Sequence, residues 1–149
     1  MNLEQRIVIT GMGAVSPVGL NCQDTFDSLT AGKSGVARIT SFDASGITCQ
    51  VAGEVKDFEP ANYMDRKMAR RIGRYAQFSI AATREALAQS GLDLTQEDPS
   101  RIACIVSSAI ADFPMVEDQM EKIFTRSKRS ISPFTVPGEH QHGGGQYRA

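Results

Sequence analysis

The stretch Arg6-Ile-Val-Ile-Thr-Gly-Met-Gly-Ala-Val-Ser-Pro-Val-Gly19 decides how this chain begins to fold. Its first five residues are mostly β-branched and apolar, and this pattern predicts a short buried strand of the kind found in parallel sheets. The glycines and the proline that follow predict a loop. The segment therefore begins a strand–loop–helix unit.

A helix is predicted directly after this loop. Asn21 is placed to cap it, and Asp24 falls in its first turn, where a negative charge is favourable. Gly32 suits the left-handed position that follows a helix. Phe26 and Leu29 lie three residues apart, so they are expected to share the buried face.

Further elements alternate along the chain. Short strands are expected around residues 48–51 and 53–55, and a long helix from about Asp65 to Ser90, ended by Gly91. Gly73 weakens this helix by about 1 kcal/mol relative to alanine. One apolar stripe follows the helical spacing: Met64, Met68, Ile72, Tyr75, Ser79, Ala82 and Ala86.

A second buried strand is predicted over Arg101–Ser107. Because it follows a long helix, it can lie parallel to the first strand, joined by a crossover. After a loop at residues 108–114, another helix is expected. Its apolar side consists of Val116, Met120, Ile123 and Phe124. The alternation predicts the α/β class.

Composition narrows the classes of function. The chain has 149 residues, of which 41% are hydrophobic and 22% charged, with a net charge of −1. These values favour a globular domain and give no reason to expect nucleic acid or an anionic membrane as partner. No apolar stretch reaches about 18 residues, and the start does not resemble a signal peptide. We expect a cytoplasmic protein.

The cysteines Cys22, Cys49 and Cys104 are expected to be reduced thiols. Their number is odd and they form no CxxC pair, which argues against zinc and disulfides. Glu139, His140 and His142 lie in a glycine-rich tail without further ligands, so no metal site is expected there. Ser107 and Ser108 lack a nucleophile elbow and an activating histidine. We expect no bound cofactor.

The pattern Gly11-x-Gly13-x-x-Ser16 invites a nucleotide-binding interpretation. However, Pro17 follows it, and the helix begins too late to place its N-terminus under the turn. The alternative is that the glycines permit positive φ and close packing.

A basic cluster, defined as Arg66, Lys67, Arg70, Arg71 and Arg74, marks the long helix. Four of its members fall at i, i+3, i+4 and i+7, so they are expected on one face. Two interpretations stay open: a solvated face, or a docking surface for an acidic protein. Nucleic acid fits less well, since no aromatic platform accompanies the cluster.

Several segments in order resemble the β-ketoacyl-acyl carrier protein synthases of the synthase II type. They run from Arg6 to Gly19, then Leu29-Thr-Ala-Gly-Lys-Ser-Gly35, Phe42-Asp-Ala-Ser45, Ala52-Gly-Glu-Val-Lys-Asp-Phe58, Met64-Asp-Arg-Lys67 and Ile131-Ser-Pro-Phe134. The resemblance runs through about Pro137. It implies part of a thiolase-like fold, whose complete form is a layered αβαβα core.

The resemblance also implies an activity: the acyltransferase reaction of bacterial fatty-acid biosynthesis, in which an acyl thioester condenses with malonyl-acyl carrier protein as carbon dioxide leaves. Family members are homodimers that use one cysteine and two histidines. None of the three cysteines here lies in the family's Thr-Ala-Cys context, so no catalytic residue is assigned. The chain alone is expected to be inactive.

One family role can be placed on residues of this chain. The family docks its acidic carrier protein on a basic patch, and Lys67, Arg70, Arg71 and Arg129 match its positions. A departure occurs at Ser107-Ser-Ala-Ile-Ala-Asp112, where the family usually has Gly-Ser-Gly-Ile-Gly-Gly. Because glycine allows close backbone approach, this substitution predicts altered local packing.

The expected organisation is a synthase N-terminal part over residues 1–137 and an aberrant, disordered Gly/His-rich tail over 138–149. We hypothesise a frameshift near Gly138, because codons of the tail read one base later can spell Val-Ser-Ile-Asn-Met-Ala-Ala-Gly-Ser-Ile, which resembles the family. Resequencing that finds one open frame and no homologous codons downstream would refute this. The alternatives are a non-catalytic carrier-protein-binding module and one piece of a split synthase.

Overall fold

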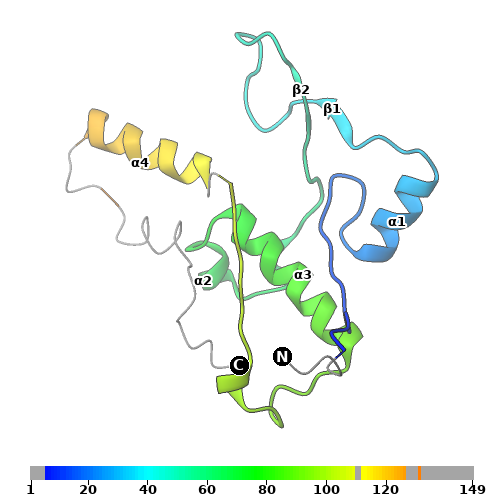
Figure 1. Ribbon diagram of the computed structural model, residues 1–149. Helices are drawn as coiled ribbons and strands as arrows, with labels where there is room; N and C mark the ends of the chain where they lie inside the picture. The colour runs from blue at the N-terminus through cyan, green and yellow to red at the C-terminus, as the bar shows by residue number, and fades with distance from the viewer. Residues whose placement is uncertain (1–5, 110–111, 127–130, 132–149) are drawn as a thin grey trace. The chain divides into compact units, whose positions relative to one another are not determined.

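The computed structural model describes residues 6–109, 112–126 and 131 (Figure 1). The chain divides into two compact units, Met1–Glu59 with Ile80–Leu92 as unit 1, and Pro60–Ser79 with Asp93–Ala149 as unit 2. Among the described residues the elements in order are α1 (Cys22–Thr30), β1 (Val36–Arg38), β2 (Val51–Gly53), η1 (Pro60–Asn62), α2 (Arg66–Ala69), α3 (Arg74–Ser90), η2 (Pro99–Arg101) and α4 (Phe113–Thr125).

The first helix forms where the sequence predicts it. The side chain of Asn21 accepts a hydrogen bond from the backbone N–H of Asp24 at 2.8 Å and so caps α1. Gly32, with φ of 68°, follows the C-cap in the left-handed region that glycine tolerates best. Both predicted helix ends are confirmed.

The predicted buried face of α1 is wrong. Phe26 is 63% exposed and Leu29 is 62% exposed, whereas Ser28 is buried. The hydroxyl of Thr25 in α1 lies 3.0 Å from the hydroxyl of Ser16 in the preceding loop. A small polar contact therefore joins α1 to this loop, and the larger apolar side chains point to solvent.

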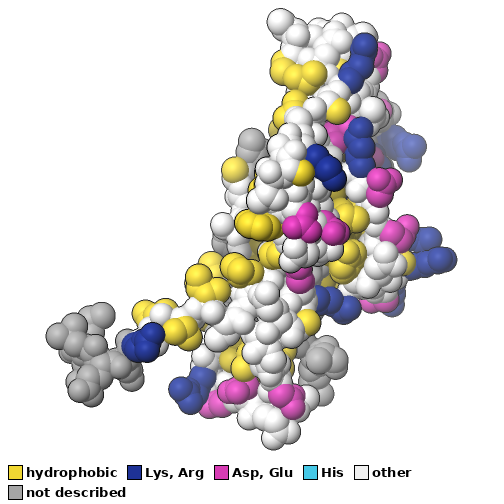
Figure 2. Space-filling model, turned by 90° about the vertical axis from the view of Figure 1, so that its right-hand side faces the viewer, with side chains coloured by type: hydrophobic (Ala, Val, Ile, Leu, Met, Phe, Trp, Pro, Cys, Tyr) yellow, Lys and Arg dark blue, Asp and Glu magenta, His cyan; other side chains and the backbone are white. Residues whose placement is uncertain are grey.

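The two predicted buried strands do not form in the part of the chain that the structure describes. Residues 6–10 and 102–108 belong to no helix or strand, and Ile7 is 100% exposed and Ile105 91% exposed. A β-branched run favours an extended backbone, but a strand requires a neighbour to receive its hydrogen bonds. Figure 2 shows that hydrophobic side chains lie at the surface of the molecule.

The observed sheet is a small antiparallel hairpin in unit 1. Its two strands pair Val36 with Gly53 and Arg38 with Val51. β1 has no counterpart among the strands predicted from the sequence, and β2 joins residues of both short predictions. The Glu54 carboxylate fixes the loop that follows β1, because it accepts hydrogen bonds from Thr40 N–H at 3.0 Å, from its hydroxyl at 2.7 Å and from Ser41 N–H at 2.9 Å.

The first segment of unit 1, which contains Gly11 and Gly13, lies in close backbone contact with the second half of α3 (Figure 1). A Cβ atom at Gly11 would overlap the backbone of Ala86, and one at Gly13 would overlap that of Ala82. Two extended residues span about 6.6 Å and four helical residues about 6 Å, so the two spacings match. Neither glycine has a positive φ among the described residues, so only the predicted close packing is confirmed.

Helix α3 also supplies hydrogen-bond acceptors to this segment. Glu85 accepts from the N–H groups of Ala14 at 2.9 Å and Cys22 at 2.8 Å, and Gln89 accepts from Met12 N–H at 2.6 Å. The Glu85 carboxylate thus bridges both ends of the loop and lies at the N-terminus of α1, where negative charge is stabilising.

Unit 2 contains the start of α3 together with α2 and α4. Its buried apolar residues are Met64, Ile72 and Ala76. Met64 and Ile72 belong to the stripe predicted for one long helix, whereas Ala76 does not. Gly91, with φ of 68°, follows α3 as predicted. In α4 the predicted apolar side is only partly covered: Val116 and Ile123 are half-buried, whereas Phe124 is 79% exposed.

We predict that Gly13→Ala weakens the packing of the first segment against α3. The new Cβ meets backbone atoms that cannot rotate away, so we expect a loss of about 1–3 kcal/mol in the free energy of unfolding, measured by urea titration. Gly46→Ala is the matched control, because Gly46 has open space around its Cβ position and no positive φ. Equal effects of the two substitutions would contradict the contact.

The second prediction concerns the pKa of Glu54. Hydrogen bonds from Ser41 and then Thr40 lower this pKa from 4.5 to about 2. Since the folded pKa is depressed, the carboxylate stabilises the hairpin fully above about pH 4.5, and this contribution is lost as the pH falls towards 2. The amide proton shifts of Thr40 and Ser41 should titrate with a midpoint near 2.

Glu54→Gln should abolish this titration, because an amide does not ionise. Glu59→Gln serves as the control and should leave it unchanged. A midpoint at the ordinary glutamate value in the unmodified chain would contradict the hydrogen bonds.

Candidate functional site

The basic cluster lies within one short segment of unit 2. Arg66 and Lys67 belong to α2, Arg70 and Arg71 to the turn that follows, and Arg74 is the first residue of α3. All five side chains belong to exposed residues. The sequence-predicted docking residues Lys67, Arg70 and Arg71 are therefore close together along the chain and accessible.

The predicted single helical face is wrong, because the expected long helix is broken. α2 ends at Ala69 and α3 begins at Arg74. One continuous helix would place four like charges on one face, which costs stability, and Gly73 is a poor helix former at the point where the break occurs. The break spreads the positive charges over a helix and a turn.

Asp65 organises α2. Its carboxylate accepts hydrogen bonds from the N–H groups of Lys67 and Met68, both at 2.9 Å. A helix of four residues has few internal hydrogen bonds, so this cap is a large share of its stability. The same negative charge lies at the positive end of the short helix.

The turn after α2 is closed by a side chain of α3. The Nε2 atom of Gln77 donates to the carbonyl oxygens of Ala69 at 2.9 Å and Ile72 at 3.4 Å. Ile72, which belongs to this turn, is buried. Backbone carbonyls that a continuous helix would satisfy thus receive a side-chain donor instead.

The cationic groups of the cluster differ in their surroundings. The Arg74 guanidinium carbon lies 4.9 Å from the ring centroid of Phe78, a geometry that favours a cation–π contact. Among the described residues, Arg66, Lys67 and Arg70 take part in no ion pair. Their charges are therefore available to an external anion. Arg129, the fourth predicted docking residue, lies outside the described residues.

The glycine loop does not present its amides to a phosphate. The N–H groups of Met12 and Ala14 already donate to the side chains of Gln89 and Glu85. A phosphate site requires such donors to be free, and the Glu85 carboxylate would repel an anion. The geometry supports the packing interpretation of Gly11 and Gly13.

The thiols are dispersed. Cys22 is half-buried, and loss of hydration together with the nearby Glu85 carboxylate raises the pKa of its thiol, which lowers its reactivity. Cys49 and Cys104 are exposed. Within the described ranges, no group of three or more His, Cys, Asp or Glu side chains could hold a metal ion. His140 and His142, like the rest of the predicted tail, lie outside these ranges.

Comparison with known proteins identifies the family. Residues 4–145 match the model of the β-ketoacyl synthase N-terminal domain. The chain belongs to the β-ketoacyl synthase family. It is 41% identical over 135 residues to 3-oxoacyl-[acyl-carrier-protein] synthase 2 of Coxiella burnetii, covering 91% of this chain and 33% of that protein. The corresponding synthase 2 of Vibrio cholerae is 37% identical over 134 residues, which cover 90% of this chain and 32% of that protein.

Solved structures place the fold among the thiolase-like ketosynthases. The ishigamide ketosynthase/chain length factor has a TM-score of 0.71 and 25% identity, covering 89% of this chain and 33% of that chain. A type II PKS acyl-carrier protein in complex with its ketosynthase gives a TM-score of 0.74 at 21% sequence identity. That match covers 92% of this chain and 35% of the other chain. The expected partial α/β thiolase-like fold is confirmed. The chain spans about a third of the length of the curated relatives that it matches.

Among the described residues of this family member, no helix combines the length and the apolar character that crossing a membrane requires. The longest α-helix in the part of the chain that the structure describes, α3, has 17 residues.

Asp65→Ala should open α2 while leaving α3 intact. Loss of the cap should cost about 0.5–2 kcal/mol, enough to expose the N–H groups of Lys67 and Met68 to exchange. Hydrogen exchange followed by NMR measures both amides individually. Asp65→Asn keeps an acceptor oxygen and should preserve most of their protection, and equal exchange in both variants would contradict the capping role.

Proposed function

We propose that this chain forms part of a β-ketoacyl-acyl carrier protein synthase of fatty-acid biosynthesis and that its basic cluster docks acyl carrier protein. The observation that carries the proposal is the concentration of exposed positive charge at α2 in a chain whose net charge is −1. The names of two relatives, each a 3-oxoacyl-[acyl-carrier-protein] synthase 2, support an acyl-carrier-protein partner.

The charge distribution supports an acidic protein as the partner. Positive side chains in one segment attract a negatively charged surface and speed its association, and the effect decreases with salt because the Debye length shortens. Arg66, Lys67 and Arg70 would each need to give up only hydration on binding, because none takes part in an ion pair among the described residues. We include Arg129 in the docking surface on the resemblance alone.

We further propose that these 149 residues do not catalyse condensation by themselves. A condensing enzyme needs an activated thiol that accepts the acyl chain, and histidines that act on the malonyl group. Cys22 has a raised thiol pKa, and none of the three cysteines lies in the Thr-Ala-Cys context of the family's nucleophile. The chain therefore contributes surface and framework to the reaction.

A second function, as one piece of a synthase completed by another polypeptide, is favoured by the exposed extended segments. Ile7, Ile9 and Ile105 are 100%, 84% and 91% exposed. Apolar β-branched side chains at such exposure favour association with a covering surface. Recovery of condensing activity on mixing with a separately made remainder of a relative would support this function.

Charge reversal tests the docking surface. We predict that Lys67→Glu, Arg70→Glu and Arg71→Glu together weaken acyl-carrier-protein binding by more than about tenfold, because attraction at three positions becomes repulsion. Calorimetric titration at low salt measures the affinity. The control reverses Lys33, Lys56 and Arg101, three exposed residues outside the basic cluster, and alters net charge equally.

Binding that the cluster reversal leaves unchanged would contradict docking at this surface. An equal loss in both triple variants would point to net charge alone. The proposal requires a loss specific to Lys67, Arg70 and Arg71.

Inactivity is tested with the same purified chain. We expect no carbon dioxide release from malonyl-acyl carrier protein above the buffer background and no lengthened acyl product by mass spectrometry. Turnover by the chain alone that disappears on substitution of one cysteine by alanine would overturn this part of the proposal.

A further inference from the structure

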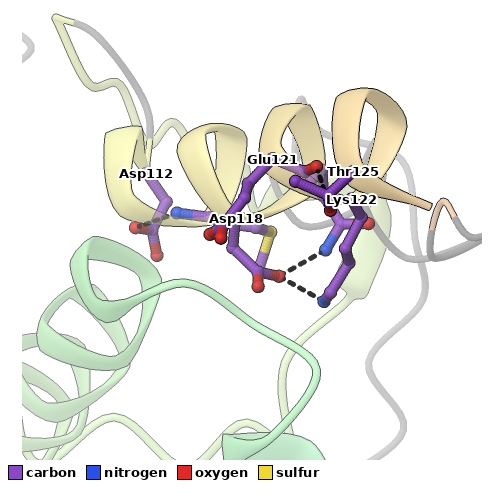
Figure 3. A network of polar contacts seen from close by, with 7 residues as sticks. Asp112, Asp118, Glu121, Lys122 and Thr125 are labelled. Carbon is purple, nitrogen blue, oxygen red and sulfur yellow. Dashed lines mark hydrogen bonds and ion pairs between the residues drawn. The ribbon is translucent and has the colours of Figure 1, made fainter.

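A single carboxylate in unit 2 contacts the first turns of two helices. Asp112 Oδ2 accepts a hydrogen bond from the backbone N–H of Arg74 at 2.7 Å, at the start of α3. Asp112 Oδ1 accepts from the N–H of Met115 at 3.4 Å, in the first turn of α4 (Figure 3). The Asp112 residue is 9% exposed, so it is almost completely enclosed.

The contact with α3 satisfies a group that the local sequence leaves without an acceptor. The first N–H groups of a helix have no partner within that helix, and the side chain of the preceding residue ordinarily accepts from the second or third of them. Gly73 precedes α3 and has no side chain. Asp112, 38 residues later in the chain, performs the capping from outside.

Gly73 and Asp112 also fit together sterically. A Cβ atom at residue 73 would overlap Oδ2 of Asp112 and would lie 2.6 Å from its Cβ. Gly73 has no positive φ, so the constraint against a side chain comes from Asp112 and not from backbone strain. The absence of a side chain at one position thus makes room for the carboxylate from the other.

The basic cluster lies directly beside this contact. Arg74 donates the hydrogen bond, and Arg70 and Arg71 occupy the turn that ends at Gly73. The backbone direction at Arg74 determines where this turn begins α3, and Gln77 of the same helix holds the carbonyl groups of the turn. A shift of the first turn of α3 would therefore move the positive charges relative to one another.

We propose that Asp112 is a positioning residue for the carrier-protein docking surface, acting through the Arg74 backbone and Gly73. The inference rests on the proposed function and deepens it. Asp112 is enclosed and negatively charged, so it acts through the placement of the basic cluster and not through contact with an acidic partner.

The test moves the cap from residue 112 to residue 73 in the full chain. Asp112→Gly removes the acceptor, and Gly73→Ser alone introduces a Cβ that collides with Asp112. The double variant G73S/D112G has room for the new serine, whose hydroxyl caps α3 locally by accepting from the N–H of Tyr75 or Ala76. Asp118→Asn is the control on α4, because it breaks the 2.5 Å ion pair with Lys122 and leaves Asp112 in place.

Two measurements read the outcome: amide hydrogen exchange at Arg74 and the Kd for acyl carrier protein. We expect each single variant to accelerate exchange and to raise Kd by about three- to tenfold, the range of a lost helix cap. Asp112→Asn, which keeps an acceptor oxygen, should return both values to within about twofold of the unmodified chain. The double variant should return Kd to the same range, because the serine caps the first turn of α3 through another amide.

Faster exchange at Arg74 in Asp112→Gly with an unchanged Kd would overturn the positioning role. A Kd that stays raised in the double variant would overturn the positioning role as well. If Asp112→Gly does not fold, comparison of Gly73→Ser with G73S/D112G decides the same question, because the proposal expects a raised Kd only in the single variant. Failure of the proposed function itself is recognised separately, by indifference of binding to reversal of Lys67, Arg70 and Arg71.

Discussion

Backbone N–H groups that have no strand or helix partner must find acceptors elsewhere, and in this chain side-chain carboxylates provide them. Glu85 receives two such groups at the ends of one loop, Glu54 receives two in the hairpin loop, and Asp65 and Asp112 receive those at helix starts. Each bond is charge-assisted and stronger than a neutral one. Removing any of these acidic side chains would leave donors unsatisfied, so the local structure of both units depends on them.

Features set by neighbouring residues could be predicted from the sequence. Asn21 and Gly32 delimit α1 because capping and left-handed termination involve only a few consecutive residues. The strand assignments for residues 6–10 and 101–107 were wrong for the complementary reason. β-Branched composition specifies an extended backbone, whereas a strand depends on a partner that the composition does not encode.

The basic cluster is evident in the sequence, whereas its shape is not. The positive charge of Lys67, Arg70 and Arg71 is evident in the sequence, and in the structure all three residues are exposed. The helix break between α2 and α3 was not predicted, because Gly73 alone is tolerated in many helices and its neighbour Asp112 is distant in sequence. Gln77 was missed as well, since a glutamine on a helix gives no signal that it caps the preceding turn.

The exposed segment at residues 7–9 has a thermodynamic consequence. Ile7, Val8 and Ile9 are 100%, 64% and 84% exposed, and full burial of such a side chain contributes about 1.5–3 kcal/mol. The burial free energy of three such side chains approaches the total stability of a typical domain, about 5–15 kcal/mol. A molecule whose surface covers this segment would therefore stabilise the folded chain by mass action. The melting temperature would then rise with the concentration of the covering molecule.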